Sequence, residues 1–168
     1  MYANATAASM EIFIISWQGQ HENASLIANQ ILHINSKVTI IYSDPDPKFV
    51  LNSPCNLIRR PNELFWEDKF NACLDAAGDN GFLVIHADCI CDDWGLLARR
   101  CKNISKNFKN LGVWAPKING TPWDVKVSGI AKIHNSDLVL SAMTDGIVFY
   151  ISAQIVERMR QFHYGNNK

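Results

Sequence analysis

The chain has 168 residues, of which 48% are hydrophobic, and this is one domain's worth of sequence with enough apolar residues for a buried core. Its 16 Lys and Arg residues balance its 16 Asp and Glu residues, so the formal net charge is zero. This balance argues against nucleic acid as the main partner, and no block of like charge indicates an interaction tail. Small-molecule or protein ligands are therefore the expected partners.

The cysteines and the N-terminal residues bear on the compartment. Five cysteines cannot form a complete set of intrachain disulfides, and Cys89-Ile-Cys91 lacks the two-residue spacer of a zinc knuckle. Residues 1–10 carry neither the basic segment nor the apolar core of a signal peptide, and no window approaches the roughly 20 apolar residues of a membrane span. We expect a cytoplasmic protein with reduced cysteines, no membrane span, and a flexible tail over residues 1–10.

The first part of the chain predicts alternating strands and helices. Glu11–Ile15 and Val38–Tyr42 are continuous apolar runs typical of buried strands, and the apolar spacing between them predicts a helix over Glu22–Ile34. A short third strand is expected at Asn56–Arg59. Strands that alternate with helices in this way indicate a parallel sheet with right-handed crossovers.

The segment from residue 62 to residue 94 is expected to organise the rest of the chain. A helical face is predicted by the spacing of Leu64, Phe65, Phe70, Leu74 and Ala77. Gly78 and Gly81 flank Asp79-Asn80 and predict the end of that helix. Phe82–Ile85 has the composition of a strand buried on both sides, and ligands bind beyond the carboxyl ends of such strands. The candidate site residues that follow this strand are His86, Asp88, Asp92 and Asp93.

The last third of the chain predicts two helices and four strands. The helices are expected over Gly95–Phe108 and Ala153–Phe162. The strands are expected at Val113–Ala115, Val125–Ile133, Asp137–Ala142 and Gly146–Ile151. The second and third of these strands nearly alternate between apolar and polar residues, which favours antiparallel pieces added at the edge of the sheet.

The run from Asn71 to Asp88, NACLDAAGDNGFLVIHAD, resembles the N-x-G-L-x-x-A-x-G-D-x-hydrophobic-D-x-D signature of family 2-like glycosyltransferases with the GT-A fold. The matching residues are Asn71, Ala76 or Ala77, Gly78, Asp79 and Asp88. His86 replaces the first acid of D-x-D, and Phe70 stands where an arginine is common. The resemblance implies an α/β, GT-A-like (Rossmann-like) fold: a three-layer α/β/α sandwich with a mostly parallel sheet and antiparallel additions. Residues 1–168 would form this single nucleotide-sugar-binding domain.

The resemblance also implies a metal site. Asp88 would hold a divalent cation, Mn²⁺ or Mg²⁺, which neutralises the diphosphate as the glycosidic bond breaks. The alternative is that Asp88 caps the next helix. His86 could be a ligand of manganese, a ribose contact or a turn residue. For Asp92 and Asp93, the capping of the helix at Trp94 is the preferred interpretation.

The resemblance assigns further contacts with the donor and the acceptor. The implied nucleotide-binding residues are Ser16, Trp17, Asp44 and Asn71. Trp17 could equally be a packing residue, and Asn71 is expected to face the sheet unless it only bonds a nearby backbone group. Asp145, in Thr-Asp-Gly before the last strand, resembles an element near the acceptor, although Asp-Gly is also a common turn.

We therefore expect a glycosyltransferase, or a domain of one, that uses a UDP-, GDP- or dTDP-sugar and a saccharide, lipid or protein acceptor. Inverting enzymes of this group carry their base in an acidic pair after the last strand and helix, but no acidic pair follows Glu157. The chain is then either a truncated domain or one without ordinary catalysis. One rival is a non-catalytic GT-A-fold binding or scaffold domain. The other is a nucleotidyltransferase, whose glycine-rich, basic first loop is missing from Ser16-Trp-Gln-Gly19.

Overall fold

The computed structural model of the chain describes residues 10–34, 37–120, 129–133 and 135–165. In chain order the elements are β1 (Glu11–Ser16), α1 (His21–Leu32), β2 (Val38–Tyr42), β3 (Asn56–Arg59), α2 (Trp66–Ala77), β4 (Phe82–His86), α3 (Trp94–Asn107), β5 (Val113–Trp114), β6 (Gly129–Lys132), β7 (Val139–Ser141), β8 (Val148–Ile151) and α5 (Ala153–Gly165). No helix within these ranges is long and apolar enough to cross a membrane.

Six strands form the main sheet in the order β3-β2-β1-β4-β8-β5. The first four are parallel, and Ile14 of β1 lies between Ile40 of β2 and Ile85 of β4. β8 runs antiparallel to β4 on one side and to β5 on the other. The predicted parallel arrangement of the strands at Ile12–Ile15, Val38–Tyr42 and Phe82–Ile85 is confirmed.

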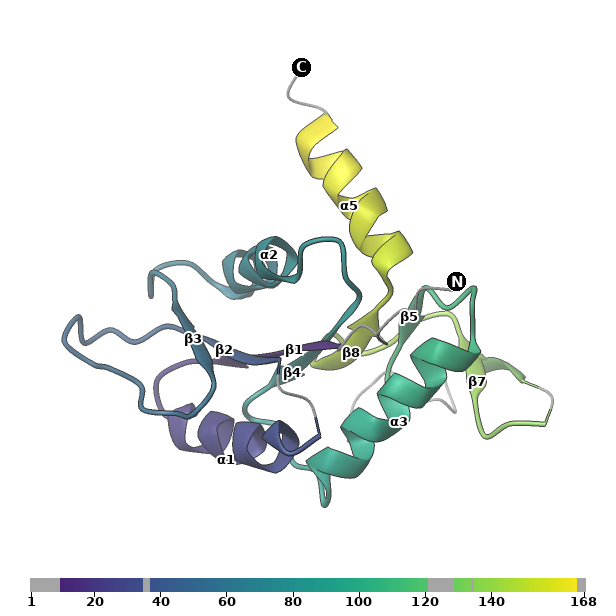
Figure 1. Ribbon diagram of the computed structural model, residues 1–168, viewed down its shortest axis with the longest axis horizontal. Coiled ribbons are helices and arrows are strands. Elements are labelled where there is room, and N and C mark those ends of the chain that lie inside the picture. The colour runs from purple at the N-terminus through teal and green to yellow at the C-terminus, as the bar shows by residue number, and fades with distance from the viewer. Residues whose placement is uncertain (1–9, 35–36, 121–128, 134, 166–168) are drawn as a thin grey trace, which may run out of the picture.

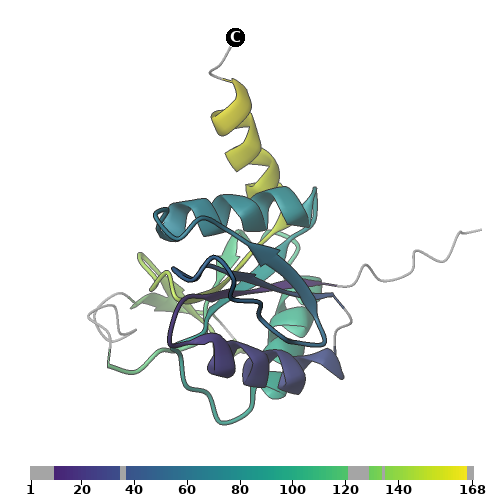
Figure 2. The same cartoon turned by 90° about the vertical axis from the view of Figure 1, so that its left-hand side faces the viewer.

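Helices cover both faces of this sheet (Figures 1 and 2). α2 lies on one face, and α1 and α3 lie on the other, while α5 starts on the α2 side and projects beyond the sheet (Figure 1). Side chains of β1 alternate accordingly: Ile12 and Ile14 belong to the core under α1 and α3, and Phe13 and Ile15 belong to the core under α2. Burial on both faces explains the continuous apolar runs of the sequence. The three-layer α/β/α prediction is confirmed.

The β6–β7 hairpin corrects one prediction. These strands pair antiparallel with each other in a separate two-stranded sheet and do not extend the main sheet. All residues of both strands are exposed, so the near-alternating sequence pattern here does not mark a buried face. The hairpin is tied to α3 by an ion pair between Asp137 and Arg100. Residues 125–128 of the predicted strand lie outside the described residues.

Two segment boundaries also differ from the prediction. α2 begins at Trp66, so Leu64 and Phe65 precede it, and the Phe65 side chain is 81% exposed instead of belonging to the helical face. The predicted tail over residues 1–10 is wrong at Met10, which is buried in the core, and residues 1–9 lie outside the described part. The helix end at Gly78 is confirmed, and its φ of +59° suits glycine.

Gly81 is required by close packing where α2 gives way to β4. A Cβ at this position would lie 2.8 Å from the carbonyl oxygen of Ile151 and would also collide with the Tyr150 hydroxyl, both on β8. Glycine therefore lets β8 approach β4 as an antiparallel neighbour. This pairing matters for function because it sets what lies beside the end of β4.

Candidate functional site

The carboxyl ends of β1, β2 and β4 meet at one edge of the sheet. Ser16 at the end of β1 pairs with Tyr42 of β2, and Ile15 pairs with His86 of β4. β2 and β4 lie on opposite sides of β1, and the helices that follow β1 and precede β4 cover opposite faces (Figure 1). Ligands of open α/β sheets bind at such a switch point. The prediction that Trp17, Asp44 and Asp88 lie at the same edge is confirmed.

Buried polar side chains connect the ends of β1 and β2. His21 Nε2 lies 3.0 Å from Oδ2 of Asp44, and His21 Nδ1 lies 2.9 Å from Oγ of Ser16. The other oxygen of Asp44 accepts the backbone N–H of Asp46 at 2.8 Å. Burial by itself would raise the pKa of Asp44, but the hydrogen bonds from Asp46 and His21 hold this pKa below its usual value. Both oxygens of the predicted nucleotide ligand Asp44 are therefore already used inside the protein.

The loop between β2 and β3 is folded around the guanidinium of Arg59. This group donates to the carbonyl oxygens of Asp44, Asp46, Pro47 and Phe49 at 3.2, 2.7, 3.1 and 2.6 Å. The Phe49 ring then stacks on His21 with 4.6 Å between ring centroids. Sequence reasoning missed Arg59 and His21, because neither a residue of a short edge strand nor the first residue of a helix gives a periodic signal.

On the other side of β1, aromatic side chains enclose His86. The ring of Trp17 meets it edge-on at 6.0 Å between centroids, and Nε1–H of Trp66 donates to His86 Nε2 at 2.5 Å. Burial lowers the pKa of His86, while the nearby carboxylates of Asp88 and Asp145 oppose this shift. The imidazole is therefore neutral at neutral pH, and its Nε2 lone pair is occupied. The prediction of His86 as a metal ligand does not fit this arrangement.

Asp145 reaches the same edge because β8 is antiparallel to β4. The start of β8 lies beside the end of β4, where the backbone N–H of His86 donates to the Ile147 carbonyl at 2.8 Å. The carboxylates of Asp88 and Asp145 both raise the pKa values of His86 and Cys89, against the effect of burial for His86 and in addition to it for Cys89. Within the described ranges, no Lys or Arg forms an ion pair with either acid.

The donor chemistry at this edge fits a cation that is shared with a ligand. Among the described residues, no three His, Cys, Asp or Glu side chains gather into a metal site. A cation bound by phosphate oxygens needs only one or two protein carboxylates, and Asp88 and Asp145 are hard oxygen donors of that kind. Cys89 does not fit, because burial and the two carboxylates raise its pKa to about 12 and keep it protonated.

The capping predictions are resolved by α3. Asp93 is its N-cap, and Oδ1 of Asp93 accepts the Leu96 N–H at 2.7 Å, as predicted for one of the two acids. Asp92 is exposed. Because Asp93 occupies the cap, the alternative of Asp88 as the cap of this helix is wrong. Asp88 is exposed, and its Oδ1 accepts from the Cys89 thiol at 3.9 Å, which leaves its other oxygen for a ligand.

Two residues of the signature, Asn71 and Asp79, lie on α2 or just after it and not at the carboxyl edge. Asn71 is exposed on α2, because the buried face of that helix passes through Phe70, Cys73 and Ala77 instead. The prediction that Asn71 faces the sheet is wrong. The Asp79 carboxylate accepts from Arg160 of α5 at 3.1 Å and so ties the end of α2 to the last helix.

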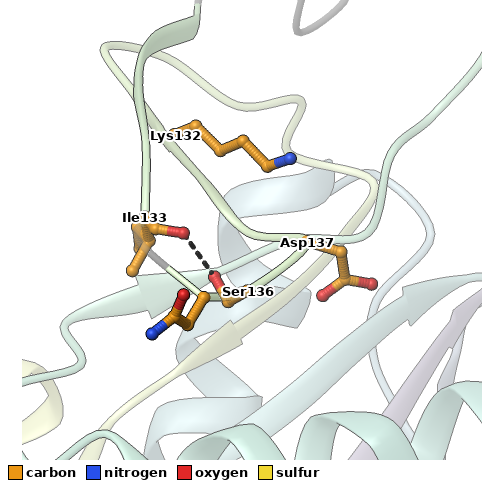
Figure 3. Close-up of a pocket in the computed structure, with 5 residues that line it drawn as sticks. Lys132, Ile133, Ser136 and Asp137 are labelled. Atoms are coloured by element: carbon orange, nitrogen blue, oxygen red, sulfur yellow. Dashed lines mark hydrogen bonds between the residues drawn. The ribbon is translucent and has the colours of Figure 1, made fainter.

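An open hollow of about 750 Å³ lies on the hairpin and not at the carboxyl edge. Its lining consists of Lys132, the last residue of β6, and of Ile133, Asn135, Ser136 and Asp137 from the turn between β6 and β7 (Figure 3). The Ser136 hydroxyl donates to the Ile133 carbonyl at 3.0 Å, and Asp137 is paired with Arg100. Two of its polar side chains, Ser136 and Asp137, are thus bound within the protein, and the carboxyl edge remains the candidate site.

Neither a family model nor a curated protein matches the sequence. Solved structures do match. A protein named as a glucose-1-phosphate thymidylyltransferase, from Bacillus anthracis, is 13% identical with a TM-score of 0.51, over 91% of this chain and 75% of that chain. A CMP:2-keto-3-deoxy-manno-octonic acid synthetase in complex with CTP is 10% identical with a TM-score of 0.55, over 92% of this chain and 78% of that chain.

The chain has a GT-A-like α/β fold, of the type that these nucleotidyltransferases share. At such low identity the similarity establishes the fold and no activity. In this GT-A-like domain the carboxyl edge of the parallel strands carries two acids without a basic partner in the described ranges, beside a cluster of aromatic rings.

Proposed function

We propose that this GT-A-like domain binds a nucleotide-diphospho-sugar together with Mn²⁺ or Mg²⁺ and belongs to a glycosyltransferase that transfers the sugar to an acceptor hydroxyl. The observation that carries the proposal is Asp88 after β4 at the switch point of the sheet, with Asp145 before the neighbouring β8. A diphosphate alone would meet these carboxylates as like charge, whereas a divalent cation held by Asp88 reverses the sign of the interaction. The signature around Asp88 supports the same role.

The edge has two halves, one at the ends of β1 and β2 and the other at the end of β4 beside β8, and they would have different tasks. Asp88 holds the cation, and Asp145 contacts the acceptor side of the site. Ser16, Asp44 and their bonds to His21 fix the loops that form the nucleotide side, while Trp17 offers a ring edge beside His86. The acceptor oxygen would attack the anomeric carbon as the bond to the nucleoside diphosphate breaks, so the domain contributes positioning and charge stabilisation.

Titration calorimetry with UDP, GDP and dTDP tests the proposal. We expect wild-type protein to bind one of them in manganese or magnesium and weakly in chelator. Asp88→Asn should lower the metal-dependent affinity about 10- to 100-fold, roughly 1.4 to 2.8 kcal/mol, because a direct carboxylate ligand is lost. Asp92→Asn is the matched control and should bind like the wild type. Equal affinities of wild type and Asp88→Asn in manganese would assign the metal to another residue, and no binding of any nucleotide would refute the function.

A second candidate is nucleotidyl transfer, which is favoured by the names of both similar structures. Such an enzyme would join a nucleoside triphosphate to a phosphorylated or acidic sugar and release pyrophosphate. Its weakness is the first loop, Ser16 to Gln20, which holds a single glycine and no Lys or Arg. A pyrophosphate-release assay with nucleoside triphosphates and sugar phosphates distinguishes the two reactions.

The non-catalytic alternative requires a turnover measurement. We expect the 168-residue chain to bind its nucleotide-sugar but to transfer little of it, because no acidic pair follows Glu157 to act as a base. Binding without transfer or hydrolysis is the result shared by a domain of a glycosyltransferase and by a binding or scaffold domain. Steady turnover that Asp88→Asn abolishes would instead show that another group on the chain acts as the base.

A further inference from the structure

Three other chain segments approach the end of β4, where the imidazole of His86 lies. The ring of Trp17, from the loop after β1, lies edge-on to it, and Trp66, the first residue of α2, donates its indole N–H to it. Asp88 follows β4 and Asp145 precedes β8, whose start lies beside the end of β4. Such a meeting of distant segments on one half-buried side chain makes its orientation specific.

The hydrogen bond from Trp66 decides which protons His86 carries. An indole nitrogen can only donate, so the imidazole nitrogen at 2.5 Å must offer a lone pair. The neutral ring then bears its single proton on Nδ1. In the described part of the chain, the structure records no hydrogen-bond partner for Nδ1, so this N–H is available to a ligand.

Trp66 and His86 are both held in place by other contacts. Trp66 stacks on Phe70 with 4.9 Å between ring centroids and an angle of 8° between the rings. His86 is fixed at its backbone by the bond to the Ile147 carbonyl. Because the imidazole of His86 is already held in one orientation, it loses little conformational entropy when its Nδ1–H binds a ligand.

We propose that Trp66 is a positioning residue that fixes His86 as a neutral hydrogen-bond donor, through Nδ1–H, to a phosphate or sugar oxygen of the bound nucleotide-sugar. An acid at this position could only accept a hydrogen bond, so His86 reverses the polarity of the contact and demands an acceptor atom on the ligand. The nature of the ligand rests on the proposed function. The proton position in the free protein does not.

Heteronuclear NMR of the imidazole nitrogens tests the proposed position of the His86 proton without any ligand. At neutral pH the wild-type spectrum should show His86 as the tautomer protonated on Nδ1. Trp66→Phe keeps an aromatic ring against Phe70 but removes the indole N–H, and should give a mixture of tautomers. Wild-type protein protonated on Nε2, or a Trp66→Phe variant with an unchanged tautomer, would overturn the proposal.

The affinity for the nucleotide that calorimetry identifies tests the proposed contact between His86 and the ligand. Trp66→Phe and His86→Leu should each weaken binding about 3- to 10-fold, the usual effect of one lost hydrogen bond. His86→Asn keeps an N–H donor near the Nδ1 position and does not depend on the indole. It should therefore bind nearly as the wild type does, and adding Trp66→Phe to it should cause no further loss.

Trp114→Phe on β5 is the control for removing a tryptophan from the core and should leave the affinity unchanged. If Trp66→Phe binds as tightly as the wild type, or weakens His86→Asn as much as it weakens the wild type, the positioning role is wrong. Failure of the wild type to bind any nucleotide, with His86 still protonated on Nδ1, would refute the proposed function and the ligand contact but leave the Trp66–His86 arrangement standing.

Discussion

Asp44 and Asp88 occupy equivalent places, each following a parallel strand at the same edge of the sheet, yet their surroundings are opposite. Asp44 is buried, and its two oxygens accept from His21 and from the backbone of Asp46. Asp88 is exposed, and no described Lys or Arg pairs with it. The position in the fold is therefore not enough to assign a function to an acid.

The difference comes from what the following loop supplies. After β2, the chain folds back around Arg59 and places a backbone N–H against Asp44. After β4, the chain runs directly to the N-cap of α3, and the neighbouring β8 brings a second acid, Asp145. The first arrangement stabilises the fold, whereas the second leaves charge to be neutralised by a ligand. Substitutions in the half of the edge that contains Asp44 should therefore change stability, and substitutions in the half that contains Asp88 should change ligand binding.

The largest expected effect is on the free energy of unfolding. Asp44→Ala should lower it by about 2–3 kcal/mol, because His21 and the Asp46 N–H lose their buried acceptor. Asp88→Ala, the matched change on the other half, should stay within about 0.5 kcal/mol of the wild type. Urea unfolding followed by circular dichroism measures both. Similar losses of unfolding free energy in the two variants would show that Asp44 and Asp88 do not differ in their contribution to stability.

The two halves should also respond to acid in different pH ranges. The pKa of His86 lies below its ordinary 6.5 in the folded state, so its stabilising contribution is complete above pH 6.5 and is lost as the pH falls through the lowered pKa. The pKa of Asp44 lies below its ordinary 3.8, so its contribution is lost only at still lower pH. In chelator, His86→Asn should flatten the first decline in unfolding free energy and Asp44→Asn the second. A first decline that survives in His86→Asn would assign it to another group.

The smallest expected effect concerns thiol chemistry beside the open half of the edge. With a pKa of about 12, Cys89 should be alkylated by iodoacetamide far more slowly at neutral pH than a free thiol, whose pKa is about 8.5. The double change Asp88→Asn and Asp145→Asn should accelerate the reaction only modestly, because burial is the main cause of the shift. Mass spectrometry of the Cys89 peptide follows the rate. Rapid modification in the wild type would mean that the thiol is not shielded as described.

The sequence by itself determined the α/β/α architecture. Strands buried on both faces must be continuous apolar runs, and helices that cover one face must repeat their apolar residues at helical spacing, so β1, β2, β4 and their helices could be recognised directly. The placement of Asp44 and Asp88 at one edge followed from the same reasoning, since parallel strands end together. The N-cap at Asp93 was also readable, because a cap is a local interaction.

Only the tertiary structure decided which of these residues are free to act. Asn71 turned out to be exposed because the exact phase of α2 depends on packing, and the Asp44 carboxylate is occupied because it bonds His21, which lies 23 positions away along the chain. The hydrogen bond between Trp66 and His86 joins residues 20 positions apart, and β8 carries Asp145 to β4 through antiparallel pairing. Contacts of this kind leave no periodic or local pattern in a sequence, since they depend on how separate elements pack.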